Sequence, residues 1–133
     1  DKRVAEIAEK TIKEVAYHLE RSADLVIRLG DGTAESHARM QAALHDLWPY
    51  TGELFIADDV DDAVVAAGIG PEPDSLKADW HETVDSVLRA ATLTVPDGDF
   101  AHKGGKHGIH TEHLGYILAD MQFLQRAYPG ATW

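Results

Sequence analysis

One long helical pattern, unbroken from residue 2 to residue 29, constrains the fold of this chain more than any other feature. Apolar or small side chains recur in it about every 3.5 residues, which places them on one face of a helix. This face carries Val4, Ala8, Thr11, Val15, His18, Ser22, Leu25 and Leu29, and Ile7, Ile12, Leu19 and Val26 widen it. At 1.5 Å per residue such a helix spans about 42 Å, a length typical of helical bundles.

The rest of the chain also has helical periodicity. No segment alternates apolar and polar residues convincingly, as a half-buried strand would. We expect further helices at 34–48 with one more turn to 55, at 58–67, at 74–93 and at 112–128. The candidate N-caps are Thr33, Asp74 or Ser75, and Thr111. The sequence therefore predicts an all-α fold.

Composition excludes several classes of function. The net charge of −11 argues against nucleic acid and against an anionic membrane, because both attract a surplus of Lys and Arg. There is no cysteine and no Gly-x-Ser-x-Gly motif, so no catalytic nucleophile is assigned. No apolar stretch is long enough to span a membrane, and no signal peptide is expected. The 133 residues suit one domain, 1–133, of a soluble, cytoplasmic protein.

The first residues lie inside the helical pattern. The chain begins with Asp1 rather than Met, and helical periodicity starts at once. A trimmed terminus is one explanation of such a start. We favour the other, that the chain is a piece of a longer protein cut at or inside a helix.

Glu14 and His18 form the first candidate metal site. Four residues apart, they share a face of the long helix, and His18 lies on its apolar stripe. Di-iron bundles place Glu and His inward at the spacing Glu-x-x-His, but Val15 holds the position three residues before His18. Further carboxylates are offered by Glu53, Glu82 and Asp85. The sequence favours the alternative, a core histidine that hydrogen-bonds Glu14 or a backbone carbonyl.

His107, His110 and His113 form the second candidate, with a spacing of three residues. Zinc binds imidazole readily, and Glu112 adds a carboxylate. The expected cap at Thr111 places His107 and His110 before the helix. Their spacing therefore does not guarantee that the three histidine side chains lie on one face. The favoured alternative is that His110 and His113 contact neighbouring chain at the helix start or at an interface.

A basic, glycine-bearing loop precedes the last expected helix in this acidic protein. It contains Lys103, Lys106 and His107, next to a helix N-terminus whose N–H groups and dipole attract anions. The loop lacks the residue order of a P-loop. It is a candidate contact for an anion or a partner, and the alternative is a solvated, mobile loop.

Residues 108–115, with the sequence Gly-Ile-His-Thr-Glu-His-Leu-Gly, and residues 118–126 resemble the C-terminal end of the PaaC family. These proteins are the non-catalytic subunits of bacterial phenylacetyl-CoA epoxidase. The resemblance continues in the same order at 12–19, 28–33, 47–48, 53–55 and 91–96. It covers essentially the whole chain. Members of the family are longer, so the chain resembles their C-terminal half.

The resemblance implies a partial ferritin-like helical bundle and a structural role in a monooxygenase complex of phenylacetate catabolism. It implies no cofactor in this chain, and a di-iron centre in a catalytic, PaaA-like partner subunit. The departure of Glu14 and His18 from Glu-x-x-His agrees with a bundle that has lost a full ligand set. Two other functions remain open: a ferritin-like di-iron oxygenase in its own right, and a metal-binding or small-ligand module.

The apolar stripe of the long helix needs a cover. At ~25 cal/mol per Å², a bare stripe of several hundred Å² forfeits on the order of 10 kcal/mol, comparable to the stability of a whole domain. Missing residues, a second copy or a partner would supply the surface. We expect a homo-oligomer in the isolated form.

Overall fold

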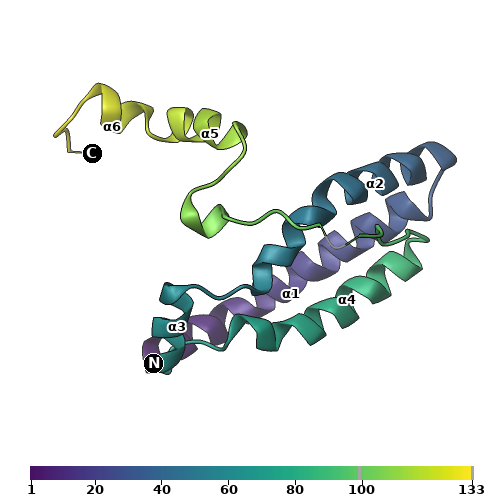
Figure 1. Cartoon of the computed structure of the whole chain (residues 1–133), viewed down its shortest axis with the longest axis horizontal. Helices are drawn as coiled ribbons and strands as arrows, with labels where there is room; N and C mark the ends of the chain where they lie inside the picture. Colours follow the sequence, from purple (N-terminus) through teal and green to yellow (C-terminus); the bar gives the residue numbers. More distant parts are fainter. Residues whose placement is uncertain (99, 133) are drawn as a thin grey trace. The chain divides into compact units, whose positions relative to one another are not determined.

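The computed structural model describes residues 1–98 and 100–132, and the elements found there are helices (Figure 1). The all-α prediction is confirmed, and the architecture is consistent with a ferritin-like helical bundle. The chain divides into two compact units, Asp1–His102 and Lys103–Trp133. Whether these two units form the single domain 1–133 that the sequence predicts is not tested by this division, and the single domain stays a prediction.

Helix α1 (Lys2–Gly30) is the backbone of the first unit. The Asp1 side chain caps it by accepting hydrogen bonds from the backbone N–H groups of Arg3 and Val4, at 2.8 and 3.3 Å. Figure 1 shows α2 and α4 lying along α1, and both contact it. The long helix predicted for residues 2–29 is confirmed.

Helix α2 (Ala34–Leu47) begins where its cap predicts. The Thr33 hydroxyl oxygen accepts the Ser36 N–H at 3.2 Å. A 3₁₀ helix, η1 (Trp48–Phe55), continues from it with Pro49 in the first turn, a position that needs no N–H donor. The further turn expected to residue 55 is confirmed.

Helix α3 (Asp59–Ala66) is held by a reciprocal capping box. The Asp58 carboxylate accepts the Val60 and Asp61 N–H groups at 2.9 and 3.0 Å, and the Asp61 carboxylate accepts the Asp58 N–H at 3.0 Å. The acidic first turn also suits the positive end of the helix dipole. The short helix predicted at 58–67 is confirmed.

Helix α4 (Lys77–Ala90) differs from prediction at both ends. A 3₁₀ turn, η2 (Pro73–Leu76), comes first, and no side chain caps the α-helix. Ser75 is not the cap, because its hydroxyl donates to the Glu72 carbonyl at 2.6 Å. The helix also ends three residues before Leu93, since Thr92 adopts a left-handed φ of 57°.

The second unit contains a 3₁₀ turn, η3 (Gly105–His107), and helices α5 (His113–Met121) and α6 (Phe123–Ala127). The prediction of one helix capped by Thr111 is wrong. Thr111 contributes its carbonyl oxygen to a turn, accepting the Leu114 N–H at 3.2 Å, and no side chain caps α5. Gln122, with φ −100° and ψ 4°, interrupts the helix.

The core of the first unit is small and lies between the C-terminal halves of α1, α2 and α4. Among the described residues, the buried apolar side chains are Leu88, Ala91 and Leu93. Half-buried side chains from the three helices pack around them: Val26, Ile27, Met40, Leu44, Trp48 and Val84. The N-terminal half of α1 therefore contributes little to this core.

Candidate functional site

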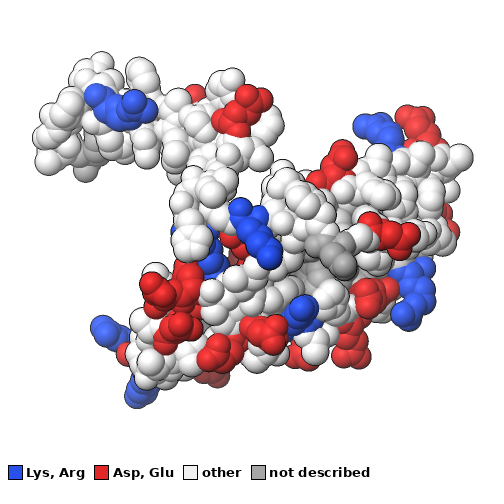
Figure 2. Space-filling view, in the orientation of Figure 1, with Lys and Arg blue, Asp and Glu red and all other residues white. Residues whose placement is uncertain are grey.

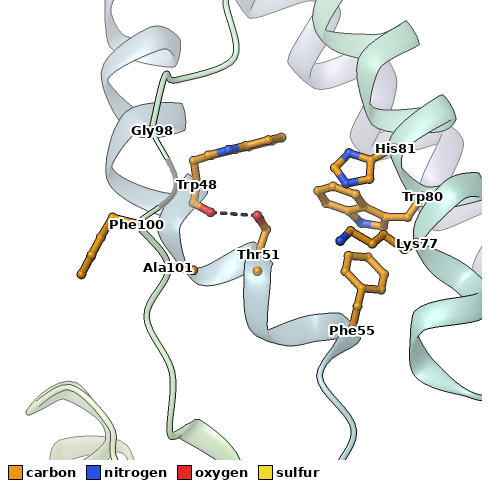
Figure 3. A pocket seen from close by; sticks show the side chains of 10 residues that line it. Trp48, Thr51, Phe55, Lys77, Trp80, His81, Gly98, Phe100 and Ala101 are labelled. Carbon is orange, nitrogen blue, oxygen red and sulfur yellow. Dashed lines mark hydrogen bonds between the residues drawn. The ribbon is translucent and has the colours of Figure 1, made fainter.

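A cavity of about 320 Å³ opens in the first unit, between η1 and α4 (Figure 3). We call it the aromatic pocket. Its lining residues are Trp48, Thr51, Gly52, Phe55, Lys77, Trp80, His81, Gly98, Phe100 and Ala101. Phe55, the last residue of η1, contacts the rings of Trp80 and His81 on α4.

The segment after α4 closes one side of the aromatic pocket. The His102 N–H donates to the Pro49 carbonyl at 2.9 Å, which holds this segment against η1. A Cβ added at Gly52 would lie only 2.7 Å from the Cβ of Ala101. Glycine at position 52 therefore permits the close approach that shapes the cavity.

Aromatic contacts fix the rings of the pocket. Phe55 meets Trp80 edge-on with ring centroids 5.5 Å apart, and His81 meets Trp80 edge-on at 5.0 Å. Trp48 lies tilted to Trp80 at 5.9 Å. These separations are those of favourable aromatic pairs. Figure 3 shows Trp48 and Thr51 on one side of the pocket, and Trp80, His81 and Phe55 on the other.

Lys77 supplies the positive charge at the aromatic pocket. In Figure 3 its nitrogen is turned toward Thr51, whose hydroxyl donates to the Trp48 carbonyl at 2.8 Å. Within residues 1–98 and 100–132, Lys77 has no ion-pair partner. Acidic side chains are plentiful on the face shown in Figure 2, where they gather over α3 and α4. The pocket thus combines aromatic walls with an ammonium group in an acidic surface.

A second hollow is an apolar groove of about 200 Å³ between α1 and α4. Its lining residues are Leu19, Ser22, Ala23 and Val26 of α1, and Thr83, Val84, Val87 and Leu88 of α4. It holds no charged side chain among its lining residues. Such a groove suits an apolar helix face better than a polar ligand.

The apolar face of α1 continues beyond this groove and is exposed. Ile7 is 63% exposed, Ile12 64% and Val15 59%. In monomers, isolated apolar residues at the surface are common, but a contiguous apolar face of this kind marks an interaction surface. We call this surface the α1 face, defined by Val4, Ile7, Ile12, Val15, Leu19, Leu25 and Leu29.

Glu14 and His18 lie on the exposed surface of α1, and the expected core position of His18 is wrong for this unit. The His18 ring lies beside that of Tyr17, with centroids 6.1 Å apart. Across the part of the chain that the structure describes, no three His, Asp or Glu side chains come together as a metal site would require. The pair is therefore not joined here by Glu53, Glu82 or Asp85.

The histidines and lysines predicted near residue 110 all belong to the second unit. Gly104, in a left-handed conformation, accepts the N–H groups of His107 and Ile109 at 2.9 Å each, so the loop is a compact turn. Exposed side chains there are Lys103, Lys106, His107, His110 and His113. Their proposed roles in anion or partner contact stay predictions.

Sequence reasoning missed the aromatic pocket. Trp48 and Trp80 fall within the helices expected at 34–48 and 74–93, and helical periodicity does not distinguish a packed core from a cavity wall. The sequence does place Lys77 three residues before Trp80, so the two side chains share a face of one helix and could line the same site. The partner element η1 had to be placed before the cavity could be recognised.

No helix in the described part of the chain combines the length and the apolar character needed to cross a membrane. All of residues 1–133 match the family model of the phenylacetic acid catabolic proteins. The chain is also 47% identical, over all 133 residues, to a protein of Escherichia coli (strain K12) that is named as a subunit of 1,2-phenylacetyl-CoA epoxidase. It spans about half of that protein, 54% of its length.

Proposed function

The chain belongs to the phenylacetic acid catabolic protein family, and from this membership we propose that it is a structural subunit of a phenylacetyl-CoA epoxidase. In this role it supports a di-iron catalytic subunit of a multicomponent monooxygenase in aerobic phenylacetate catabolism, and it has no active site of its own. The observation that carries the proposal is the 47% identity, over the full 133 residues, to the relative that is named as an epoxidase subunit.

The α1 face supports a role in assembly. Ile7, Ile12 and Val15 are each more than half exposed. In an isolated chain their apolar surface stays in contact with water, which is less favourable than burial. At roughly 25 cal/mol per Å², covering several hundred Å² contributes on the order of 10 kcal/mol. We expect the remaining helices of a longer protein or another subunit to cover this face in the complex, and a second copy to cover it in isolation.

The placement of Glu14 and His18 supports a non-catalytic role. They are four residues apart, and Val15 holds the position that the Glu-x-x-His spacing of di-iron bundles would require for the glutamate. The alternative is a ferritin-like oxygenase in its own right. It would need this pair to be completed by ligands from several helices.

The turn at Gly104–Gly108 is the second proposed contact. Lys106 and His107 are exposed in this turn, and Lys103 is exposed just before it. His110 lies between the turn and α5, and His113 is the first residue of α5. In an acidic chain this positive segment suits a partner surface or an anionic group such as a CoA phosphate. The cytoplasm is the compartment that this role requires.

Co-purification with the di-iron catalytic subunit tests the proposal. We expect the two to form a stable complex, and Val15→Asp to weaken it by placing a charge on the α1 face. Tyr17→Asp is the matched control, because Tyr17 is 62% exposed on the same helix but lies about 160° away around its axis. Failure of the parent chain to bind the catalytic subunit, or equal effects of the two substitutions, would contradict the proposal.

A further inference from the structure

We propose that the aromatic pocket is a binding site for a small aromatic carboxylate, whose ring contacts the pocket's aromatic walls and whose carboxylate pairs with Lys77. The inference depends on the pocket alone and is independent of the subunit role proposed above. All of the lining residues belong to the first unit.

The size of the cavity sets the class of ligand. At about 320 Å³ it lies at the small end of the range for ligand pockets, which runs from roughly 300 to 1,000 Å³. It therefore suits one aromatic ring with a short acidic side chain. A cofactor with several rings would extend beyond the pocket.

The walls favour an aromatic ring over an aliphatic one. Phe55 and His81 each meet Trp80 edge-on, and these contacts hold the rings in place before a ligand enters. A preorganised site loses little side-chain entropy on binding. A planar ligand ring gains edge-to-face or offset contacts with such walls, and a cyclohexane ring of similar size does not.

Lys77 selects the charge of the ligand. Its ammonium group has no ion-pair partner in the described residues, and Figure 3 shows it turned into the pocket toward Thr51. A cationic ligand would be repelled by Lys77, and a neutral ring would form no ion pair with it. A carboxylate on a short arm provides the opposite charge in a compact form.

Phenylacetate is the probe, and tryptophan fluorescence is the readout. The chain has three tryptophans, so Trp133→Phe leaves Trp48 and Trp80, both in the pocket wall, as the reporters. We expect a saturable change with a dissociation constant on the order of 1 mM, as befits so small a ligand. Cyclohexylacetate, which has the charge without the aromatic ring, and 2-phenylethanol, which has the ring without the charge, should each bind at least about fivefold more weakly.

Lys77→Met separates the charge from the rest of the pocket, because methionine keeps most of the aliphatic stem. We expect phenylacetate to bind about fivefold more weakly and 2-phenylethanol to bind as before, a loss appropriate to an ion pair at an exposed site. Lys13→Met, at an exposed lysine of α1 outside the pocket, is the control and should change neither affinity.

A measurement on the unsubstituted lysine guards against misfolding of the variant. Raising the salt concentration should weaken phenylacetate binding and leave 2-phenylethanol unaffected, because salt screens the ion pair alone. The proposal is overturned by any of three results. These are no saturable binding of phenylacetate, equal binding of cyclohexylacetate, or salt-independent binding of phenylacetate.

Discussion

Gln41 and Thr94 are joined by two hydrogen bonds across 53 residues of sequence. The side-chain amide of Gln41 donates to the Thr94 carbonyl at 2.8 Å, and its carbonyl oxygen accepts the Thr94 backbone N–H at 2.9 Å. One side chain thus satisfies both backbone groups of a residue that lies outside any helix. The pair ties α2 to the segment that follows α4.

Removal of this pair should destabilise the first unit. We expect Gln41→Ala to lower the free energy of unfolding by roughly 1–2 kcal/mol, because each hydrogen bond contributes about 1 kcal/mol net. Urea denaturation followed by circular dichroism measures the change. Gln125→Ala, at an exposed glutamine of α6, is the control and should stay within about 0.5 kcal/mol of the parent. An unchanged midpoint for Gln41→Ala would show that the pair contributes nothing.

The close approach of α1 to the end of α4 makes a second prediction. A Cβ added at Gly30 would lie 2.5 Å from the Ala91 carbonyl oxygen and 2.8 Å from the Ala91 Cβ. Ala91 is fully buried, so neither backbone can move without cost, and we expect Gly30→Ala to lower the free energy of unfolding by about 1–3 kcal/mol.

Gly115→Ala is the matched control for this substitution. Gly115 lies within α5, and a Cβ there meets no atom within 4 Å. Alanine should therefore raise the stability of that helix by up to about 1 kcal/mol, its gain in helix propensity. If Gly30→Ala left the thermal midpoint unchanged or raised it, the close approach of Gly30 to Ala91 would be refuted.

The capping box of α3 makes a third prediction. Asp58→Ala removes the acceptor for the Val60 and Asp61 N–H groups and should cost about 1 kcal/mol. Asp58→Asn retains the capping oxygen and should restore most of the loss. Chemical denaturation distinguishes the two variants. Equal stability of the alanine and asparagine variants would mean that the cap does not hold this helix.

The histidines at the start of α5 allow a fourth prediction, which rests on the proposed partner contact. We expect substitution of His110 and His113 by alanine to weaken binding to the catalytic subunit without changing the metal content of the chain. Pull-down and elemental analysis on the same preparations measure both quantities. Loss of bound zinc together with partner binding would instead favour a metal site.

A fifth prediction concerns iron. Purified without chelator, the chain should contain no stoichiometric iron, since the described residues offer Glu14 and His18 without further ligands. Elemental analysis is the measurement, and Glu14→Ala with His18→Ala is the check. Stoichiometric iron that disappears in this double variant would show an iron site at Glu14 and His18 and overturn the structural role in favour of the metalloenzyme alternative.

The N-caps show which helix starts can be predicted from neighbouring residues alone. The cap at Thr33 was predicted correctly, because a side-chain oxygen at an N-cap acts on N–H groups only two or three residues away. The helix at 58–67 was predicted without its Asp58 cap, which the structure shows. The same reasoning failed at Thr111 and Ser75. At Thr111 a turn uses the backbone carbonyl, and at Ser75 a 3₁₀ turn gives the hydroxyl a different partner.

The sequence by itself determined the all-α fold and the apolar face of α1, because helical periodicity and capping operate within a few residues. Tertiary structure alone decided the aromatic pocket and the Gln41–Thr94 pair. Trp48 and Trp80 are 32 positions apart by number (80 − 48), yet their rings lie 5.9 Å from each other. Contacts of that kind depend on how α4 packs against α1, α2 and η1, and a pattern read along the chain carries no information about which helices will meet.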